Sequence, residues 1–117
     1  MSSALTKDQI LAVDDRRMTS MHVEEWSGDV WFRVITSAER DAFEMQFAQD
    51  DKRATENIRA RLLVITLCNE NGERIFDAEN DIEALGAKSG RVLDKLFDMA
   101  REVNGMTDDA VKDAEGN

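Results

Sequence analysis

The strongest hydrophobic pattern in the first half of the chain is a pair of short segments rich in β-branched and aromatic residues. Residues 21–26 read Met-His-Val-Glu-Glu-Trp and residues 30–35 read Val-Trp-Phe-Arg-Val-Ile, with Ser-Gly-Asp between them. Two such segments around a glycine-containing turn are typical of a β-hairpin. We therefore predict that the chain begins its folded part with a hairpin.

The register of this hairpin follows if Gly28-Asp29 forms a two-residue turn. Trp26 then lies opposite Trp31, and Glu24 lies opposite Arg33. Directly opposed residues share a face of the sheet. The predicted core face comprises Met21, Val23, Val30, Phe32 and Val34. The predicted amphipathic face comprises His22, Glu24, Trp26, Trp31, Arg33 and Ile35.

Capping signals and apolar residues at helical spacing predict helices in much of the rest of the chain. Thr36 and Glu39 form a capping box, with Thr36 or Ser37 as the capping residue. The clearest amphipathic helix opens at Ser89 or Gly90 and ends at Asn104-Gly105. Shorter helices are expected after three other capping residues, Thr6, Asp77 and Thr107.

Residues 53–68 are compatible with more than one structure. Apolar residues at helical spacing indicate a helix, but residues 62–68 form a continuous apolar run that periodicity cannot resolve. We favour a helix, because no helix-breaking residue interrupts the segment. Residues 69–72, Asn-Glu-Asn-Gly, are then either a hairpin turn or the C-terminal cap of that helix.

These elements predict an α+β fold, in which an N-terminal β-hairpin is followed by a mainly helical bundle of four to five helices. A chain of 117 residues is expected to form a single domain over residues 1–117. We expect its ends, about residues 1–16 and 107–117, to be frayed, because the short N-terminal helix needs tertiary support and the C-terminal segment holds few apolar residues.

The charge of the chain excludes several classes of partner. It has 15 Lys and Arg against 25 Asp and Glu, for a formal net charge of −10. Phosphate backbones and anionic membranes attract basic surfaces, so we expect neither nucleic-acid nor membrane binding. We find no signal-peptide pattern and no apolar run near the roughly 20 residues that cross a bilayer, which indicates a cytoplasmic protein.

Few residues of the chain are suited to catalysis, metal binding or cofactor binding. Cys68 is the single cysteine and His22 the single histidine, so the chain lacks an intrachain disulfide and paired histidines for zinc. Gly-rich phosphate-binding patterns are missing as well. We therefore predict no catalytic, cofactor-binding or metal-binding residues and no cofactor, and we expect a non-enzymatic protein that acts through its surfaces.

The central part of the chain resembles a known family. Residues 58–76, from Ile-Arg-Ala-Arg to Arg-Ile-Phe, resemble the central block of tail assembly chaperones from long-tailed, siphovirus-type bacteriophages. In that family an Arg-containing apolar segment runs into a polar turn with glycine and then a short hydrophobic pair ending in Phe. Residues 31–41, 81–86 and 93–105 resemble other family elements in the same order, so the similarity covers about residues 23–106.

This resemblance implies a phage or prophage protein of the host bacterial cytoplasm that is not expected in the mature virion. Proteins of the family coat the tape measure protein before the tail tube polymerises around it, and they contact the tail tube protein. The resemblance therefore implies these two partners, and it leaves homo-oligomerisation open. The family often also makes a longer, frameshifted form.

We identify partner-binding candidates in two places. One is the Trp26, Trp31 and Arg33 face of the hairpin, and the other is the apolar surface around Leu63 and Leu67, although core positions would explain both equally well. The alternative hypothesis is a small acidic regulatory or inhibitory protein, such as a mimic of DNA charge, that acts by protein–protein binding.

Overall fold

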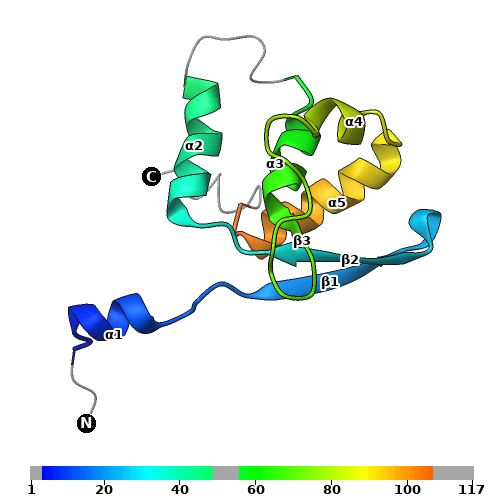
Figure 1. Ribbon diagram of the computed structural model, residues 1–117. Coiled ribbons are helices and arrows are strands. Elements are labelled where there is room, and N and C mark those ends of the chain that lie inside the picture. The colour runs from blue at the N-terminus through cyan, green and yellow to red at the C-terminus, as the bar shows by residue number, and fades with distance from the viewer. Residues whose placement is uncertain (1–3, 49–55, 107–117) are drawn as a thin grey trace, which may run out of the picture.

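A three-stranded antiparallel sheet forms one side of the protein in a computed structural model that describes residues 4–48 and 56–106 (Figure 1). The strands lie in the order β1 (Met18–Val23), β2 (Gly28–Arg33) and β3 (Leu67–Cys68). The helices are α1 (Lys7–Ala12), α2 (Ser37–Ala48), α3 (Ile58–Thr66), α4 (Ile82–Gly86) and α5 (Gly90–Val103). This confirms the predicted α+β fold, with a hairpin followed by helices, and adds the strand β3.

The hairpin is present, but its register differs from the prediction. Ser20 lies opposite Trp31, and Val23 lies opposite Gly28. Residues 24–26 form a short 3-10 helix, η1, and Ser27 follows it with a left-handed φ of 54°. The predicted Gly28-Asp29 turn and the predicted Trp26–Trp31 pair are therefore wrong, because the chain reverses earlier through a longer loop.

The core face of the hairpin is nevertheless as predicted within the paired strands, whereas Ile35, which was assigned to the amphipathic face, is buried at 6% exposure. The observed register differs from the predicted one by an even number of residues, and such a shift leaves each side chain on its original face of the sheet. Val23 and Phe32 are accordingly buried, with exposures of 1% and 0%. Met21 and Val30 are partly buried against the same core.

The apolar run at 62–68 changes from helix to strand. The helical interpretation is confirmed for α3, which begins after Asn57 in a left-handed conformation with φ of 53°. It is wrong for Leu67–Cys68, where the backbone becomes extended and pairs with β2. Cys68 then pairs with Arg74 across residues 69–72, so the hairpin-turn alternative is correct for this segment.

Local capping signals set the helix boundaries largely as expected. The Thr36 N–H donates to Glu39 Oε1 at 2.8 Å, and the Glu39 N–H donates to Thr36 Oγ1 at 3.1 Å. Thr6 and Ser89 cap α1 and α5 as predicted. Asp77 instead accepts hydrogen bonds in a turn before α4, which begins only at Ile82. The helix predicted after Thr107 and the C-terminal end predicted to fray lie outside the described residues.

The core lies between the sheet and helices α3 and α5, which cover one face of the sheet (Figure 1). Full burial of a Leu or Phe side chain stabilises a fold by about 1.5–3 kcal/mol each. The largest buried apolar side chains are Phe32, Leu62, Leu63, Leu67 and Leu96.

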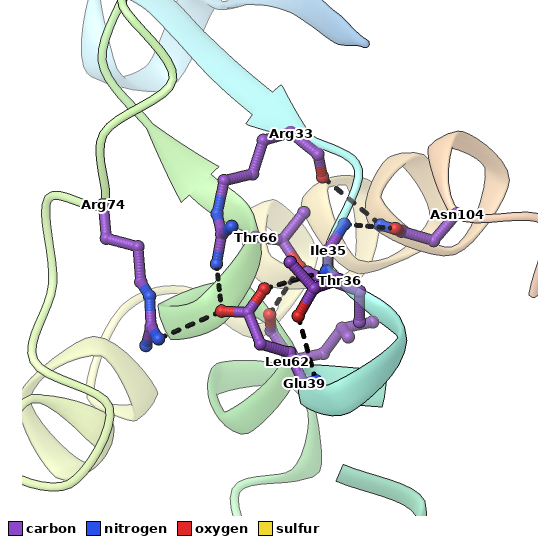
Figure 2. A network of polar contacts seen from close by, with 8 residues as sticks. All are labelled: Arg33, Ile35, Thr36, Glu39, Leu62, Thr66, Arg74 and Asn104. Atoms are coloured by element: carbon purple, nitrogen blue, oxygen red, sulfur yellow. Dashed lines mark hydrogen bonds and ion pairs between the residues drawn. The ribbon is translucent and has the colours of Figure 1, made fainter. Parts of the chain in front are cut away.

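Two ion pairs that share the Glu39 carboxylate join three parts of the chain at the end of β2 (Figure 2). Arg33 is 7% exposed, and its Nη2 lies 2.5 Å from Glu39 Oε2. The Nη2 of Arg74, from the segment after β3, lies 3.0 Å from the same oxygen. Arg33, which was assigned to the amphipathic face and to a partner-binding surface, is instead buried, because Glu39 at the start of α2 gives its charge a partner.

Asn104 makes a second buried polar connection beside the first (Figure 2). Its Oδ1 accepts from the Ile35 N–H at 2.8 Å, and its Nδ2 donates to the Ala100 carbonyl at 2.9 Å. Arg40 of α2 donates to the Asn104 carbonyl at 3.1 Å. The end of α5 is thereby tied both to the chain after β2 and to α2.

We expect Glu39→Gln to lower the free energy of unfolding at pH 7 by about 2 kcal/mol, because it leaves the Arg33 guanidinium buried without a carboxylate. Partial burial acts to raise the pKa of Glu39, but hydrogen bonds from Arg33 and the Thr36 amide outweigh it and hold that pKa below its usual value. The ionised carboxylate thus contributes stability above its unfolded-state pKa, and this contribution disappears as pH falls through the lower folded-state pKa.

Urea unfolding of the wild type and Glu39→Gln between pH 7 and about pH 3 measures this difference, which should shrink toward acid pH. Glu44→Gln is the matched control, because the Arg40–Glu44 pair is about half exposed and contributes little. A difference that stays constant over this pH range would show that the Glu39 charge is not responsible.

We expect Asn104→Ala to lower the free energy of unfolding by about 2 kcal/mol, since the buried Ile35 N–H loses its acceptor. Asn71, whose side chain lies at the surface, is the matched control, and Asn71→Ala should change stability by less than about 0.5 kcal/mol. Equal effects of the two substitutions in urea unfolding would contradict this role of Asn104.

Candidate protein-binding surfaces

Trp31 lies in a shallow hollow on the sheet face opposite α3 and α5. It is half-buried beside Cys68, its partner across β2 and β3. The hollow has a volume of about 630 Å³, and Ile75, at 53% exposure, lies on its border. Polar residues complete the lining: Asp29, Asn69, Glu70 and Asn71. The hollow therefore offers apolar surface within a polar, partly acidic border.

The three hairpin residues predicted to bind a partner together are separated in the structure. Trp26 lies in η1 at the hairpin tip and is 37% exposed. Trp31 lies within β2, and Arg33 is buried in its ion pair with Glu39. The predicted surface of Trp26, Trp31 and Arg33 is not formed, because the actual register moves Trp26 beyond the paired strands.

Leu63 and Leu67 are core residues. Their exposures are 0% and 1%, so a partner cannot reach them in this fold. Their burial agrees with the core alternative that the sequence left open. The sequence does not reveal whether Leu63 and Leu67 are buried or exposed, because every position in a continuous apolar run has the same character.

A second hollow of about 720 Å³ is bounded by α2, α3 and the segment from Arg74 to Glu83. Phe43 anchors α2 at this place and is 6% exposed. The lining mixes apolar side chains with both signs of charge: Phe43, Ile65, Ala78 and Ile82 with Arg61, Arg74, Glu39, Glu56, Glu79 and Glu83. Such a mixed lining favours no single class of small molecule.

The pKa shifts and contacts of the titratable groups near these surfaces are explained by burial and by local hydrogen bonds. Burial raises the pKa of the Cys68 thiol, which keeps it protonated and unreactive. His22 Nδ1 lies 2.8 Å from Asp29 Oδ1, but both side chains are more than half exposed. Hydrogen bonds from the amides of Asn80 and Glu79 lower the pKa of Asp77.

Across residues 4–48 and 56–106, no group of three or more His, Cys, Asp or Glu side chains is placed to hold a metal ion.

Sequence reasoning missed Ile75 and Met18 as exposed apolar residues of this side of the protein. Met18 was assigned to no face, and Ile75 follows residues 69–72, for which a hairpin turn and a helix cap were both left open. The signal available was a short apolar pair, Ile75 and Phe76, between the charged residues Arg74 and Asp77. Within the described part of the chain, no helix is long and apolar enough to cross a membrane.

Comparison with known proteins assigns this arrangement of elements to a family. A family model described as phage tail assembly chaperone matches residues 7–116. The solved structure of the bacteriophage HK97 tail assembly chaperone has the same fold, with a TM-score of 0.61 at 18% sequence identity. That match covers 86% of this chain and 95% of the other. Among curated proteins no match is found. Because the family model spans nearly the whole chain, this protein belongs to the phage tail assembly chaperone family.

Proposed function

We propose that this protein binds the tape measure protein of a long-tailed phage, keeps it soluble until the tail tube forms around it, and helps to recruit tail tube protein. It acts in the host cytoplasm, catalyses no reaction and is absent from the mature virion. Membership of the tail assembly chaperone family supports a role in assembly, and the partners named here are part of the proposal.

The observation that carries the proposal is the Trp31 hollow on the face of the sheet that α3 and α5 leave uncovered. Half-buried Trp31 and exposed Ile75 present apolar surface there, and Asp29 and Glu70 add negative charge at the border. Aromatic residues in partly desolvated pockets provide much of the affinity of protein interfaces. The hollow fits an apolar side chain of the tape measure protein that is flanked by basic residues.

The net charge of −10 suits the same task. An unassembled helical protein with an apolar face aggregates through that face. A bound chaperone covers the apolar face and adds negative charge, so the complexes repel each other and stay in solution. The combination of an apolar hollow with an overall negative charge favours a chaperone over a mimic of DNA charge. Such a mimic needs negative charge rather than apolar surface at its binding site.

We expect Ile75→Asp to reduce the yield of soluble tape measure protein several-fold when the two proteins are co-expressed, because it places a charge in the apolar contact. Ile75 is 53% exposed, so the free energy of unfolding should change by less than about 0.5 kcal/mol. Met45→Asp is the matched control: Met45 is 57% exposed on α2, away from the hollow, and its substitution should leave the yield unchanged.

Trp31→Ala should also weaken capture of the tape measure protein while the chain stays folded. A large fall in melting temperature would instead show that Trp31 acts as a core residue. If the wild type solubilises tape measure protein and both Ile75→Asp and Trp31→Ala do so equally well, the hollow is not the binding surface. If the wild type itself has no effect on solubility, the proposed function is wrong.

A further inference from the structure

An asparagine followed directly by glycine occurs twice in the sequence, at Asn71-Gly72 and at Asn104-Gly105. In such a pair the backbone nitrogen of the glycine can attack the side-chain carbonyl carbon of the asparagine, because glycine has no Cβ to obstruct the approach. The two atoms must come within about 3–3.5 Å of each other, which requires a side chain that is free to turn. The structure places the two asparagines in opposite environments.

Asn104 is held in place by the core of the protein. It is 8% exposed, its Oδ1 accepts from the Ile35 N–H at 2.8 Å, and its Nδ2 donates to the Ala100 carbonyl at 2.9 Å (Figure 2). The Gly105 N–H donates to the Glu102 carbonyl at 3.1 Å. Both reacting groups are thus engaged inside the fold, and the reaction at this position requires the buried network to break.

Asn71 lies in the exposed turn after β3, on the border of the Trp31 hollow. Its backbone N–H donates to Asn69 Oδ1 at 2.9 Å, but within the described part of the chain its side-chain amide makes no hydrogen bond. The Gly72 N–H donates to the Asn69 carbonyl at 3.0 Å. Opening of this one surface turn frees the Gly72 nitrogen, and local opening of a turn requires much less free energy than global unfolding.

We propose that Asn71 is a site of spontaneous covalent modification, with water as its co-reactant. The Gly72 nitrogen bonds to the Asn71 side-chain carbon, and the side-chain nitrogen leaves as ammonia with the proton that the Gly72 nitrogen gives up. Water then opens the resulting five-membered imide. Opening at the side-chain carbonyl gives aspartate, and opening at the main-chain carbonyl gives isoaspartate.

Both products change the charge of the Trp31 hollow. Asp29 and Glu70 already lie in its lining, and either product adds one further carboxylate at position 71. Aspartate keeps the length of the main chain, so the turn and the shape of the hollow persist. The aspartate product therefore alters the electrostatics of the hollow and leaves its apolar surface in place.

Isoaspartate also changes the main chain of the turn. The Asn69 N–H donates to the Glu73 carbonyl at 2.9 Å, and the Glu73 N–H donates to Asn69 Oδ1 at 3.0 Å. These bonds close the turn and bring Ile75 back beside β3, at the border of the hollow. Isoaspartate inserts one methylene into the main chain between Asn69 and Glu73, so it breaks this register and displaces Ile75. The resulting loss of partner capture rests on the function proposed above.

Peptide mapping by mass spectrometry tests the site without any partner. In the folded, full-length chain at mildly alkaline pH, we expect at least about tenfold more deamidation at Asn71 than at Asn104 after the same time. In urea that unfolds the chain, the two sites should react at similar rates, because the local fold no longer separates them. Equal rates in the folded chain, or an Asn71 that stays intact there, would overturn the proposal.

Asn71→Gln is the matched blocking variant. Its longer side chain would have to form a six-membered ring, so position 71 should remain unmodified while the chain folds normally. An isoaspartate-specific methyltransferase should label the aged wild type and leave aged Asn71→Gln unlabelled. Equal labelling of the two aged chains would place the modification elsewhere and contradict the assignment to Asn71.

A solubility assay with tape measure protein separates the charge from the change in the main chain. We expect aged wild type to keep several-fold less tape measure protein in solution than fresh wild type, whereas Asn71→Asp and aged Asn71→Gln should act like the fresh chain. An isoaspartate-containing chain that captures as well as the fresh one would show that the hollow is unaffected. If fresh wild type captures nothing, the proposed function fails, and the peptide map still decides whether Asn71 is the modified residue.

Discussion

The Glu39 carboxylate holds the architecture together at the point where its parts meet. Arg33 ends the hairpin, Glu39 begins α2, and Arg74 follows β3, and a single carboxylate contacts both guanidinium groups. Without this charge, Arg33 would be cationic and buried, which is strongly unfavourable. Together with the hydrogen bond from Arg40 to the Asn104 carbonyl and the buried side chain of Phe43, the Glu39 contacts fix the position of α2, and α2 lines the 720 Å³ hollow.

Local signals in the sequence predicted the elements well, and long-range contacts explain where the prediction was wrong. Capping by Thr36 and Ser89 depends on residues three positions away, so the sequence contains all the required information. The sequence does not contain enough information to fix the hairpin register, because a shift by an even number of residues leaves the pattern of buried and exposed positions unchanged. Leu67 and Cys68 became a strand only because β2 offers them an unpaired edge.

The candidate site was harder to predict, for a related reason. Trp31, Leu63 and Leu67 have the same apolar character in the sequence, yet packing buries the two leucines and leaves Trp31 half-exposed. Arg33 appeared to be a surface residue because its partner Glu39 belongs to the next element. Ile75 borders the hollow only because residues 69–72 turn the chain back beside β3. Each of these facts depends on tertiary structure.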